Sequence, residues 1–94
     1  MPSRDVELYM HGTPDHPRTA HSLLACRMLA YHGITYTAYD ILTDQPARKR
    51  AQTASGVGMW PQVFADSEYL GGTEVLTELL RSGQLRSDRN ATQP

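Results

Sequence analysis

The alternation of hydrophobic and polar residues along the chain predicts four short strands. Val6–Met10 alternates apolar and polar side chains, as a half-buried strand does. Residues 34–41 are rich in β-branched and aromatic side chains, which favours a second strand. Two further runs, residues 61–65 and 68–70, flank a turn at residues 66–67 and are typical of a β-hairpin. Together these segments are expected to form one sheet.

The spacing of hydrophobic residues between the strands predicts three helices. The first begins at Arg18 or Thr19 and ends near His32-Gly33, where glycine is a common helix stop. Its apolar residues recur at three- and four-residue intervals: Leu23, Leu24, Met28, Leu29 and Tyr31. This helix therefore follows the first strand through a short polar loop.

Capping signals mark the second and third helices. Asp44 suits the N-cap of a helix over residues 47–53, and Pro46 suits its first turn. Two glycines introduce the third helix, over residues 73–81, whose inward-facing set is Leu76, Leu79 and Leu80. The predicted order is β-α-β-α-β-β-α. This order indicates an α/β three-layer sandwich, a four-stranded mixed sheet with helices on both faces.

Length and composition fit one small domain. Of the 94 residues, 39% are hydrophobic and 20% charged, which is ordinary for a globular chain. The stretch from Leu85 onward is polar and is expected to be frayed, so that residues 1–85 form the domain and residues 86–94 a polar C-terminal tail. A net charge of −1 and no basic run longer than residues 48–50 argue against nucleic-acid binding. No apolar run approaches the roughly 20 residues of a membrane span and no signal peptide is recognisable, so a cytoplasmic protein is expected.

The single cysteine, Cys26, excludes an internal disulfide and a metal site made of cysteines alone. It lies seven residues beyond Thr19, about two helical turns further along the first helix. Two interpretations stay open. Cys26 is a small buried hydrophobic residue, or it is a displaced redox nucleophile that lacks the help of a helix N-terminus.

Four segments follow the order and spacing of known motifs. They are Met-His-Gly-Thr-Pro at residues 10–14, Thr-Ala-His-Ser at 19–22, Trp-Pro-Gln-Val-Phe at 60–64 and Leu-Gly-Gly-Thr-Glu at 70–74. Over roughly residues 5–85 the chain resembles the monothiol glutaredoxins. In that family the corresponding segments are Met-Lys-Gly-Thr-Pro, Cys-Gly-Phe-Ser, the segment that bears the cis-proline, and Val-Gly-Gly-Cys/Ser-Asp. The resemblance implies a thioredoxin/glutaredoxin-like fold and a glutathione site.

The chain departs from the family pattern at the functional positions. Thr19 stands at the position of the nucleophilic cysteine, and its hydroxyl, whose pKa lies far above that of a thiol, cannot enter disulfide exchange. His11 replaces a lysine that meets the glutathione carboxylate, and His21 replaces a phenylalanine. Val-Gly-Met at residues 57–59 replaces Trp-Pro-Thr. Because cluster binding in the family needs the cysteine thiolate, no iron–sulfur cluster is expected.

The segments that hold glutathione in the family are better retained. The resemblance implies a cis peptide bond at Trp60-Pro61, which leaves the backbone of Trp60 to pair with an extended peptide ligand. It also implies that the backbone at Gly72 and a helix beginning at Thr73 receive a carboxylate, while Glu74 accepts the α-amino group. The alternative is that the glycines only turn the chain, and that Thr73 and Glu74 form an ordinary helix start.

The histidines and two other side chains near the predicted site have more than one interpretation. Three histidines, His11, His16 and His21, are expected to gather at the Thr19 end of the sheet. They are solvated loop residues, or they form a metal site, an anion clamp or a general base, although no metal-ligand spacing is present and no metal is expected. Of the functional roles we favour His11 as a weaker substitute for the ligand-pairing lysine, charged mainly below about pH 6.5. Thr19 caps its helix or donates to a glutathione thiolate, and Trp60 lines the groove or lies at the core edge.

Two classes of function follow from these features. In the first, the chain is a degenerate, redox-inactive glutaredoxin-like module that recognises glutathione, a glutathionyl adduct or a partner protein through the old groove. In the second, it is a glutathione-dependent enzyme of the transferase or isomerase type, in which Thr19, with His11 or His21 beside it, acts on the thiol. The first needs fewer assumptions and is the prediction. Neither nucleic acid nor a membrane is expected as a partner.

Overall fold

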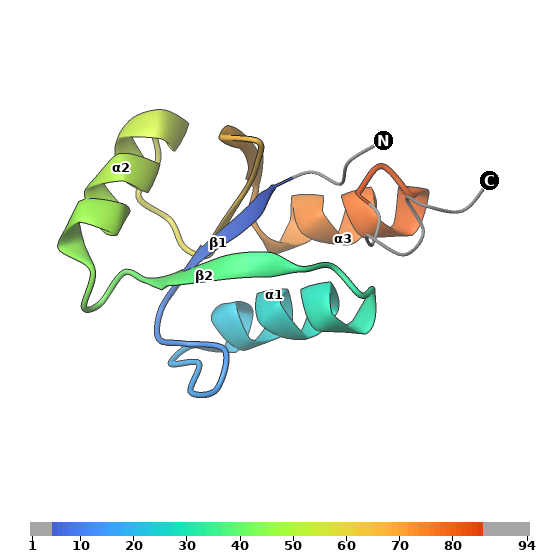
Figure 1. Cartoon of the computed structure of the whole chain (residues 1–94), viewed down its shortest axis with the longest axis horizontal. Helices are drawn as coiled ribbons and strands as arrows, with labels where there is room; N and C mark the ends of the chain where they lie inside the picture. Colours follow the sequence, from blue (N-terminus) through green and yellow to red (C-terminus); the bar gives the residue numbers. More distant parts are fainter. Residues whose placement is uncertain (1–4, 86–94) are drawn as a thin grey trace.

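The centre of the molecule is a four-stranded mixed sheet with the strand order β2-β1-β3-β4 (Figure 1). The computed structural model describes residues 5–85. The strands are β1 (Val6–Met10), β2 (Tyr36–Asp40), β3 (Gln62–Ala65) and β4 (Glu68–Gly71). β1 pairs in parallel with β2 and antiparallel with β3, and β3 pairs antiparallel with β4. The predicted order of elements and the mixed sheet are confirmed.

Helices cover both faces of this sheet. They are α1 (Ala20–Tyr31), α2 (Gln45–Ser55) and α3 (Thr73–Ser82). Figure 1 shows α2 on one side of the sheet and α1 and α3 on the other. Because successive side chains of a strand point to opposite faces, Leu8 packs with residues of α1 and α3, whereas Tyr9 packs with Ala47 and Ala51 of α2. The molecule therefore has two cores, one in each space between helices and sheet.

The buried face of α1 differs from the expected one. Its buried residues are Ser22, Ala25, Cys26 and Leu29, which follow the i, i+3, i+4, i+7 spacing of one helix face. Leu23, Leu24 and Tyr31 are 38%, 47% and 87% exposed. The predicted apolar spacing therefore belongs to a helix, as expected, but these three residues do not form its buried face, because the sheet accepts only one stripe of the helix and that stripe is built mostly from small residues.

The two ends of α2 are set by the expected kinds of residue. The Ala47 N–H donates a hydrogen bond of 3.0 Å to Asp44 Oδ1, which confirms the predicted N-cap. The helix runs beyond Thr53, where the prediction ended it, to Gly56, whose positive φ of 81° terminates it in the left-handed conformation. The predicted second strand was too long. Ile34 is buried, but the strand pairing begins only at β2.

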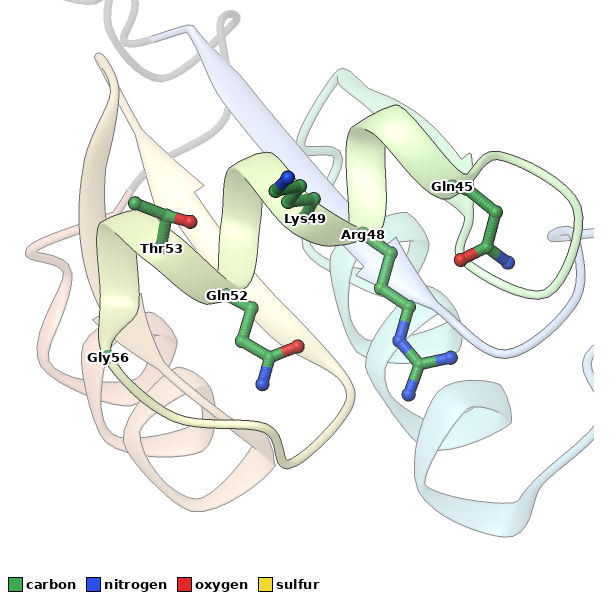
Figure 2. Close-up of a pocket in the computed structure, with 6 residues that line it drawn as sticks. All are labelled: Gln45, Arg48, Lys49, Gln52, Thr53 and Gly56. Atoms are coloured by element: carbon green, nitrogen blue, oxygen red, sulfur yellow. The ribbon is translucent and has the colours of Figure 1, made fainter.

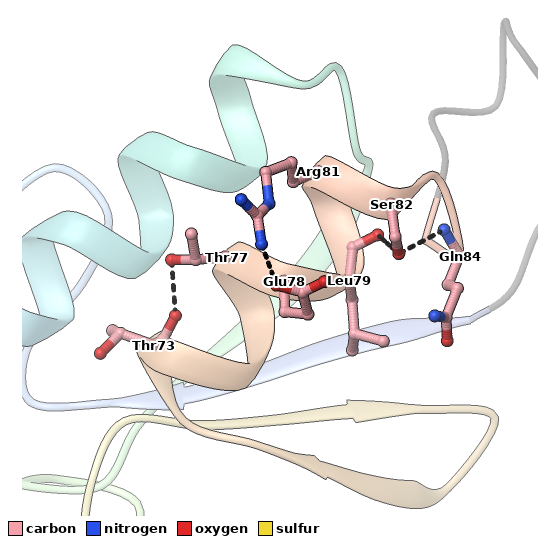
Figure 3. Close-up of polar contacts among 7 residues, drawn as sticks. All are labelled: Thr73, Thr77, Glu78, Leu79, Arg81, Ser82 and Gln84. Carbon is pink, nitrogen blue, oxygen red and sulfur yellow. Dashed lines mark hydrogen bonds and ion pairs between the residues drawn. The ribbon is translucent and has the colours of Figure 1, made fainter.

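The third helix carries its own polar contacts on the exposed side (Figure 3). Thr77 Oγ1 donates to the Thr73 carbonyl at 2.8 Å. In the next turn of the helix, Arg81 forms an ion pair with Glu78. On the inner side Leu76 and Leu80 are buried, as predicted, while Leu79 is partly buried. This packing holds the first turn of α3 in place against the sheet.

The chain remains ordered in the core up to Leu85. Its side chain is 3% exposed, and its N–H donates to the Leu79 carbonyl at 3.1 Å. The expectation that fraying begins at Leu85 was therefore wrong, because this leucine completes the core beside α3. The predicted tail, residues 86–94, lies outside the described residues. Within residues 5–85, no helix is long and apolar enough to cross a membrane.

Candidate functional site

Thr19 lies directly before α1 and caps it. Its backbone is extended, with φ −135° and ψ 158°, and its Oγ1 accepts a hydrogen bond of 3.2 Å from the Ser22 N–H. This confirms the predicted cap on an amide three residues further on. The Thr19 side chain is exposed, and the cap uses its oxygen as an acceptor, so the hydroxyl hydrogen is left for another partner. Donation to a ligand thiolate stays a prediction.

The loop between β1 and α1 is fixed by side-chain hydrogen bonds. The buried Ser22 Oγ accepts from the His11 N–H at 3.0 Å, and the Gly12 N–H donates to Asp40 Oδ1 at 3.0 Å. Gly12 has a positive φ of 93°, and a Cβ there would lie 2.4 Å from the His16 carbonyl oxygen. Only glycine fits this position without a backbone shift.

A cavity of about 700 Å³, here called the ligand groove, brings together most of the predicted site residues. The predicted residues that line it are His11, His21, Trp60, Pro61, Gly72, Thr73 and Glu74. They come from the end of β1, from α1, from the segment before β3 and from the first turn of α3. Among the described residues, Thr19 and His16 do not line it. Two of the three histidines thus line the groove, while His16 lies in the loop between β1 and α1, where it exchanges backbone hydrogen bonds with Thr13.

One wall of the groove is formed at a cis peptide bond between Trp60 and Pro61. Across from it, a Cβ placed on Gly72 would lie 3.5 Å from the Pro61 carbonyl oxygen, so the two backbone segments run close together. The Trp60 side chain is partly buried and packs against the core under α2. Trp60 therefore fits both interpretations, because it lines the groove and lies at the core edge.

The N-terminus of α3 forms another part of the groove. Gly72 is its N-cap and supplies no side-chain hydrogen bond, so no side chain caps the first amides of this ten-residue helix. Such amides, together with the helix dipole, favour a bound carboxylate. Glu74 is exposed in the first turn and is the acidic residue among those that line the groove.

Residues that were not predicted as site residues also line the groove: Arg48, Gly58, Met59, Tyr69 and Val75. Arg48 comes from α2 and adds a permanent positive charge near His11 and His21. The sequence signal was the basic run of residues 48–50, but its members have different surroundings. Arg50 lies over the ring of Tyr39, with its guanidinium carbon 5.2 Å from the ring centroid.

A shallower cavity of about 530 Å³ lies along α2 (Figure 2). It is lined by Gln45, Arg48, Lys49, Gln52, Thr53 and Gly56. Figure 2 shows these polar side chains spread along the exposed side of the helix. Arg48 borders both cavities, so the basic end of the ligand groove continues onto the surface of α2.

Two further predictions concern metals and the cysteine. In the described part of the chain, no group of three or more His, Cys, Asp or Glu side chains is placed to hold a metal ion. The Nδ1 atom of His11 is buried and has no hydrogen-bond partner there. Cys26 is 5% exposed, and its Sγ donates to the Leu23 carbonyl at 3.3 Å. The structure thus places Cys26 in the core, as the first of its two interpretations expected.

Comparison with known proteins assigns the class to which this fold and groove belong. Residues 6–70 match the family model described as Glutaredoxin. The chain therefore belongs to the glutaredoxin family. It is 39% identical over 85 residues to monothiol glutaredoxin-S11 of Oryza sativa subsp. japonica, covering 90% of this chain and 17% of that protein. It is 36% identical over 81 residues to the mitochondrial glutaredoxin-related protein 5 of Danio rerio, covering 85% of this chain and 52% of that protein. The chain thus spans about half of the length of one of these relatives and less than a fifth of the other.

Solved structures agree with this assignment. The mature form of Trypanosoma brucei 1CGrx1 superposes with a TM-score of 0.79 at 31% identity, over 86% of this chain and 57% of that one. A buckwheat glutaredoxin–glutathione complex superposes with a TM-score of 0.71 at 14% identity, over 87% of this chain and 73% of that one. These similarities confirm the predicted thioredoxin/glutaredoxin-like fold.

Proposed function

We propose that this chain is a degenerate monothiol glutaredoxin-like module that binds glutathione or a glutathionyl adduct in the ligand groove. In this proposal residue 19 performs no thiol–disulfide exchange. The observation that carries it is the meeting of three recognition elements in one cavity: the Trp60-Pro61 backbone, the uncapped N-terminus of α3, and the basic end formed by His11 and Arg48.

Each part of the tripeptide has a suitable partner in the groove. The γ-glutamyl carboxylate binds at the first amides of α3, and its ammonium group pairs with Glu74. The cysteinyl backbone pairs with Trp60 as an added strand. The glycyl carboxylate lies toward His11, which can donate a hydrogen bond, and toward Arg48, which supplies positive charge. The buckwheat structure, a complex with glutathione, supports glutathione as the ligand to test first.

The proposed absence of thiol–disulfide exchange rests on two residues, Thr19 and Cys26. The motifs assign the nucleophile position to Thr19, whose hydroxyl oxygen caps α1. Cys26, the only thiol of the chain, lies on α1 and is buried in the core that α1 and α3 form with the sheet. A thiolate must reach the substrate disulfide to attack it, and a buried thiol does not. For the same reason no iron–sulfur cluster is expected at this site, since its cysteine ligand is replaced.

The binding proposal is tested by titrating the isotopically labelled protein with glutathione. Amide resonances of His11, Trp60, Gly72 and Thr73 are expected to shift together at millimolar ligand. S-methylglutathione is the matched probe, and it should bind within about twofold of glutathione because the module does not use the thiol. If none of the four amides shifts with either ligand, the proposal is wrong.

The chemical part of the proposal is tested on a glutathionylated mixed disulfide. The wild-type chain should reduce it no faster than free glutathione does, and the Thr19→Cys variant should gain activity. Cys26→Ser is the control, which should leave the wild-type result unchanged. Wild-type turnover that disappears in Cys26→Ser would contradict the assignment of Cys26 to the core.

A second candidate, a glutathione-dependent transferase or isomerase, is favoured by one observation. Thr19 is exposed and its hydroxyl hydrogen is not used by the helix cap, so it is able to donate to a ligand thiolate near His21. This enzyme would prefer glutathione to S-methylglutathione and would conjugate an activated aryl halide. Thr19→Val should abolish that reaction while Thr19→Ser preserves it.

A further inference from the structure

Gln62 is a fully buried polar residue directly after the cis peptide bond. It is 0% exposed and is the first residue of β3. Both hydrogens of its side-chain amide are used, because Nε2 donates to the carbonyls of Val57 and Met59 at 2.9 Å each. Its Oε1 is buried and finds no partner among the described residues. In the sequence, Gln62 is distinguished only as the third residue of the Trp-Pro-Gln-Val-Phe segment.

The segment held by Gln62 has few other anchors. The side chains of Val57 and Met59 are 39% and 78% exposed. The Val57 carbonyl has a second partner, since Ser55 Oγ donates to it at 3.2 Å. Within residues 5–85 the Met59 carbonyl has Gln62 as its only donor. The orientation of the peptide unit between Met59 and Trp60 therefore depends on Gln62.

The geometry of that peptide unit determines where the next N–H points. The cis peptide bond of the described chain is Trp60-Pro61, so the unit between Met59 and Trp60 is trans. In a trans peptide the C=O and the N–H point in opposite directions. With the Met59 carbonyl directed inward to Gln62, the Trp60 N–H is directed away from the core. This N–H has no acceptor among residues 5–85, and Trp60 lines the ligand groove.

We infer that Gln62 is a positioning residue, which turns the Trp60 N–H into the ligand groove so that it can donate to the backbone carbonyl of an extended peptide ligand. This inference rests on the proposed function, because it assigns the donor for the cysteinyl part of the tripeptide. Gln62 does not touch the ligand itself. It acts through the Met59–Trp60 peptide unit, which it holds in one orientation.

The test compares Gln62→Met with wild type and with Gln52→Met. Methionine fills nearly the same volume but has no N–H donors. Gln52 is the control because its side chain is exposed and lies close to the same segment, residues 57–59. Its Nε2 is the atom nearest to a Cβ built on Gly58. We expect Gln62→Met to weaken glutathione binding at least tenfold and to abolish the ligand-induced shift of the Trp60 amide. The amides of Gly72 and Thr73 should still shift at higher ligand concentration, whereas a loss of folding would move every resonance.

A second variant keeps the inference testable if Gln62→Met does not fold. Gln62→Glu has the same shape, offers no donor when ionised and offers one O–H donor when protonated. Its affinity, divided by that of wild type at the same pH, should recover as the pH is lowered through the carboxyl titration. If both variants bind glutathione with wild-type affinity and show a normal Trp60 amide shift, the inferred role of Gln62 is wrong, while the proposed function is unaffected. Absence of glutathione binding by the wild type would overturn the proposed function, and this inference with it.

Discussion

Replacement of Thr19 separates the structural role of this residue from the exchange chemistry that the proposed function denies it. The Thr19 hydroxyl satisfies one free amide of α1, through the 3.2 Å bond from Ser22. Removing such a cap costs about 1 kcal/mol, within a range of 0.5–2. For a domain of this size each kcal/mol lowers the melting temperature by about 4–8 °C. Thr19→Ala should therefore melt about 4–8 °C below wild type, and Thr19→Ser close to wild type.

The informative variant is Thr19→Cys. Sulfur is a weak acceptor, so this variant should lose nearly as much stability as Thr19→Ala while it gains reductase activity. Thermal unfolding followed by circular dichroism measures the first effect, and reduction of a glutathionylated substrate measures the second. If Thr19→Ala melts at the wild-type temperature, the cap does not stabilise α1 as argued. If Thr19→Cys is folded and binds glutathione but stays inactive, the absence of a thiol at position 19 does not by itself account for the missing exchange activity.

Three further predictions concern the loop, the groove and the core. Gly12→Ala should lower the free energy of unfolding by more than about 1 kcal/mol in urea titrations, because the backbone φ at this position is 93° and the alanine Cβ would collide with the His16 carbonyl. An unchanged urea midpoint would contradict this. His11→Lys should strengthen glutathione binding at pH 8 by up to about fivefold, which is the free energy expected of a partly exposed ion pair. If calorimetry shows no gain in affinity, the glycyl carboxylate binds elsewhere. Burial, with a smaller effect from Cys26, raises the pKa of Tyr36 above its ordinary value of 10.0. The stability that the neutral phenol contributes is therefore complete below pH 10, and it is lost as the pH rises through the pKa of the folded state. Tyr36→Phe should then show a smaller fall in its urea midpoint above pH 10 than wild type, and an equal fall would refute the assignment.

Local signals in the sequence were sufficient to predict most of the fold. The caps at Thr19 and Asp44 act on amides three residues away, so their effect is readable without the rest of the structure. The two-residue turn at Asp66 and Ser67 is also a local feature, and the structure gives both residues positive φ. The inward face of α1 is not local. Leu23 and Leu24 are more hydrophobic than Ser22 and Ala25, yet the sheet selects the smaller residues.

The site could be predicted only in part, for a similar reason. His11, Trp60 and Gly72 were found because they belong to contiguous motifs whose spacing survives. Arg48 lies between two motifs on a helix, and nothing in the run of residues 48–50 shows which cation faces the groove. The role inferred for Gln62 depends on where two carbonyls of the preceding segment point, and the folding of that segment, not a local sequence signal, determines this.

The loop between β1 and α1 has a thermodynamic consequence for any ligand. Hydrogen bonds from the His11 and Gly12 amides to the side chains of Ser22 and Asp40 fix the backbone of this loop. These acceptors belong to the protein, so no ligand is needed to order the loop. The ordering entropy of this loop is therefore lost when the protein folds and is not lost again on association. A ligand that meets a preorganised wall keeps more of its interaction free energy as affinity. For the proposed function, this rigid wall is a receptor surface whose use in binding does not require a thiol at position 19.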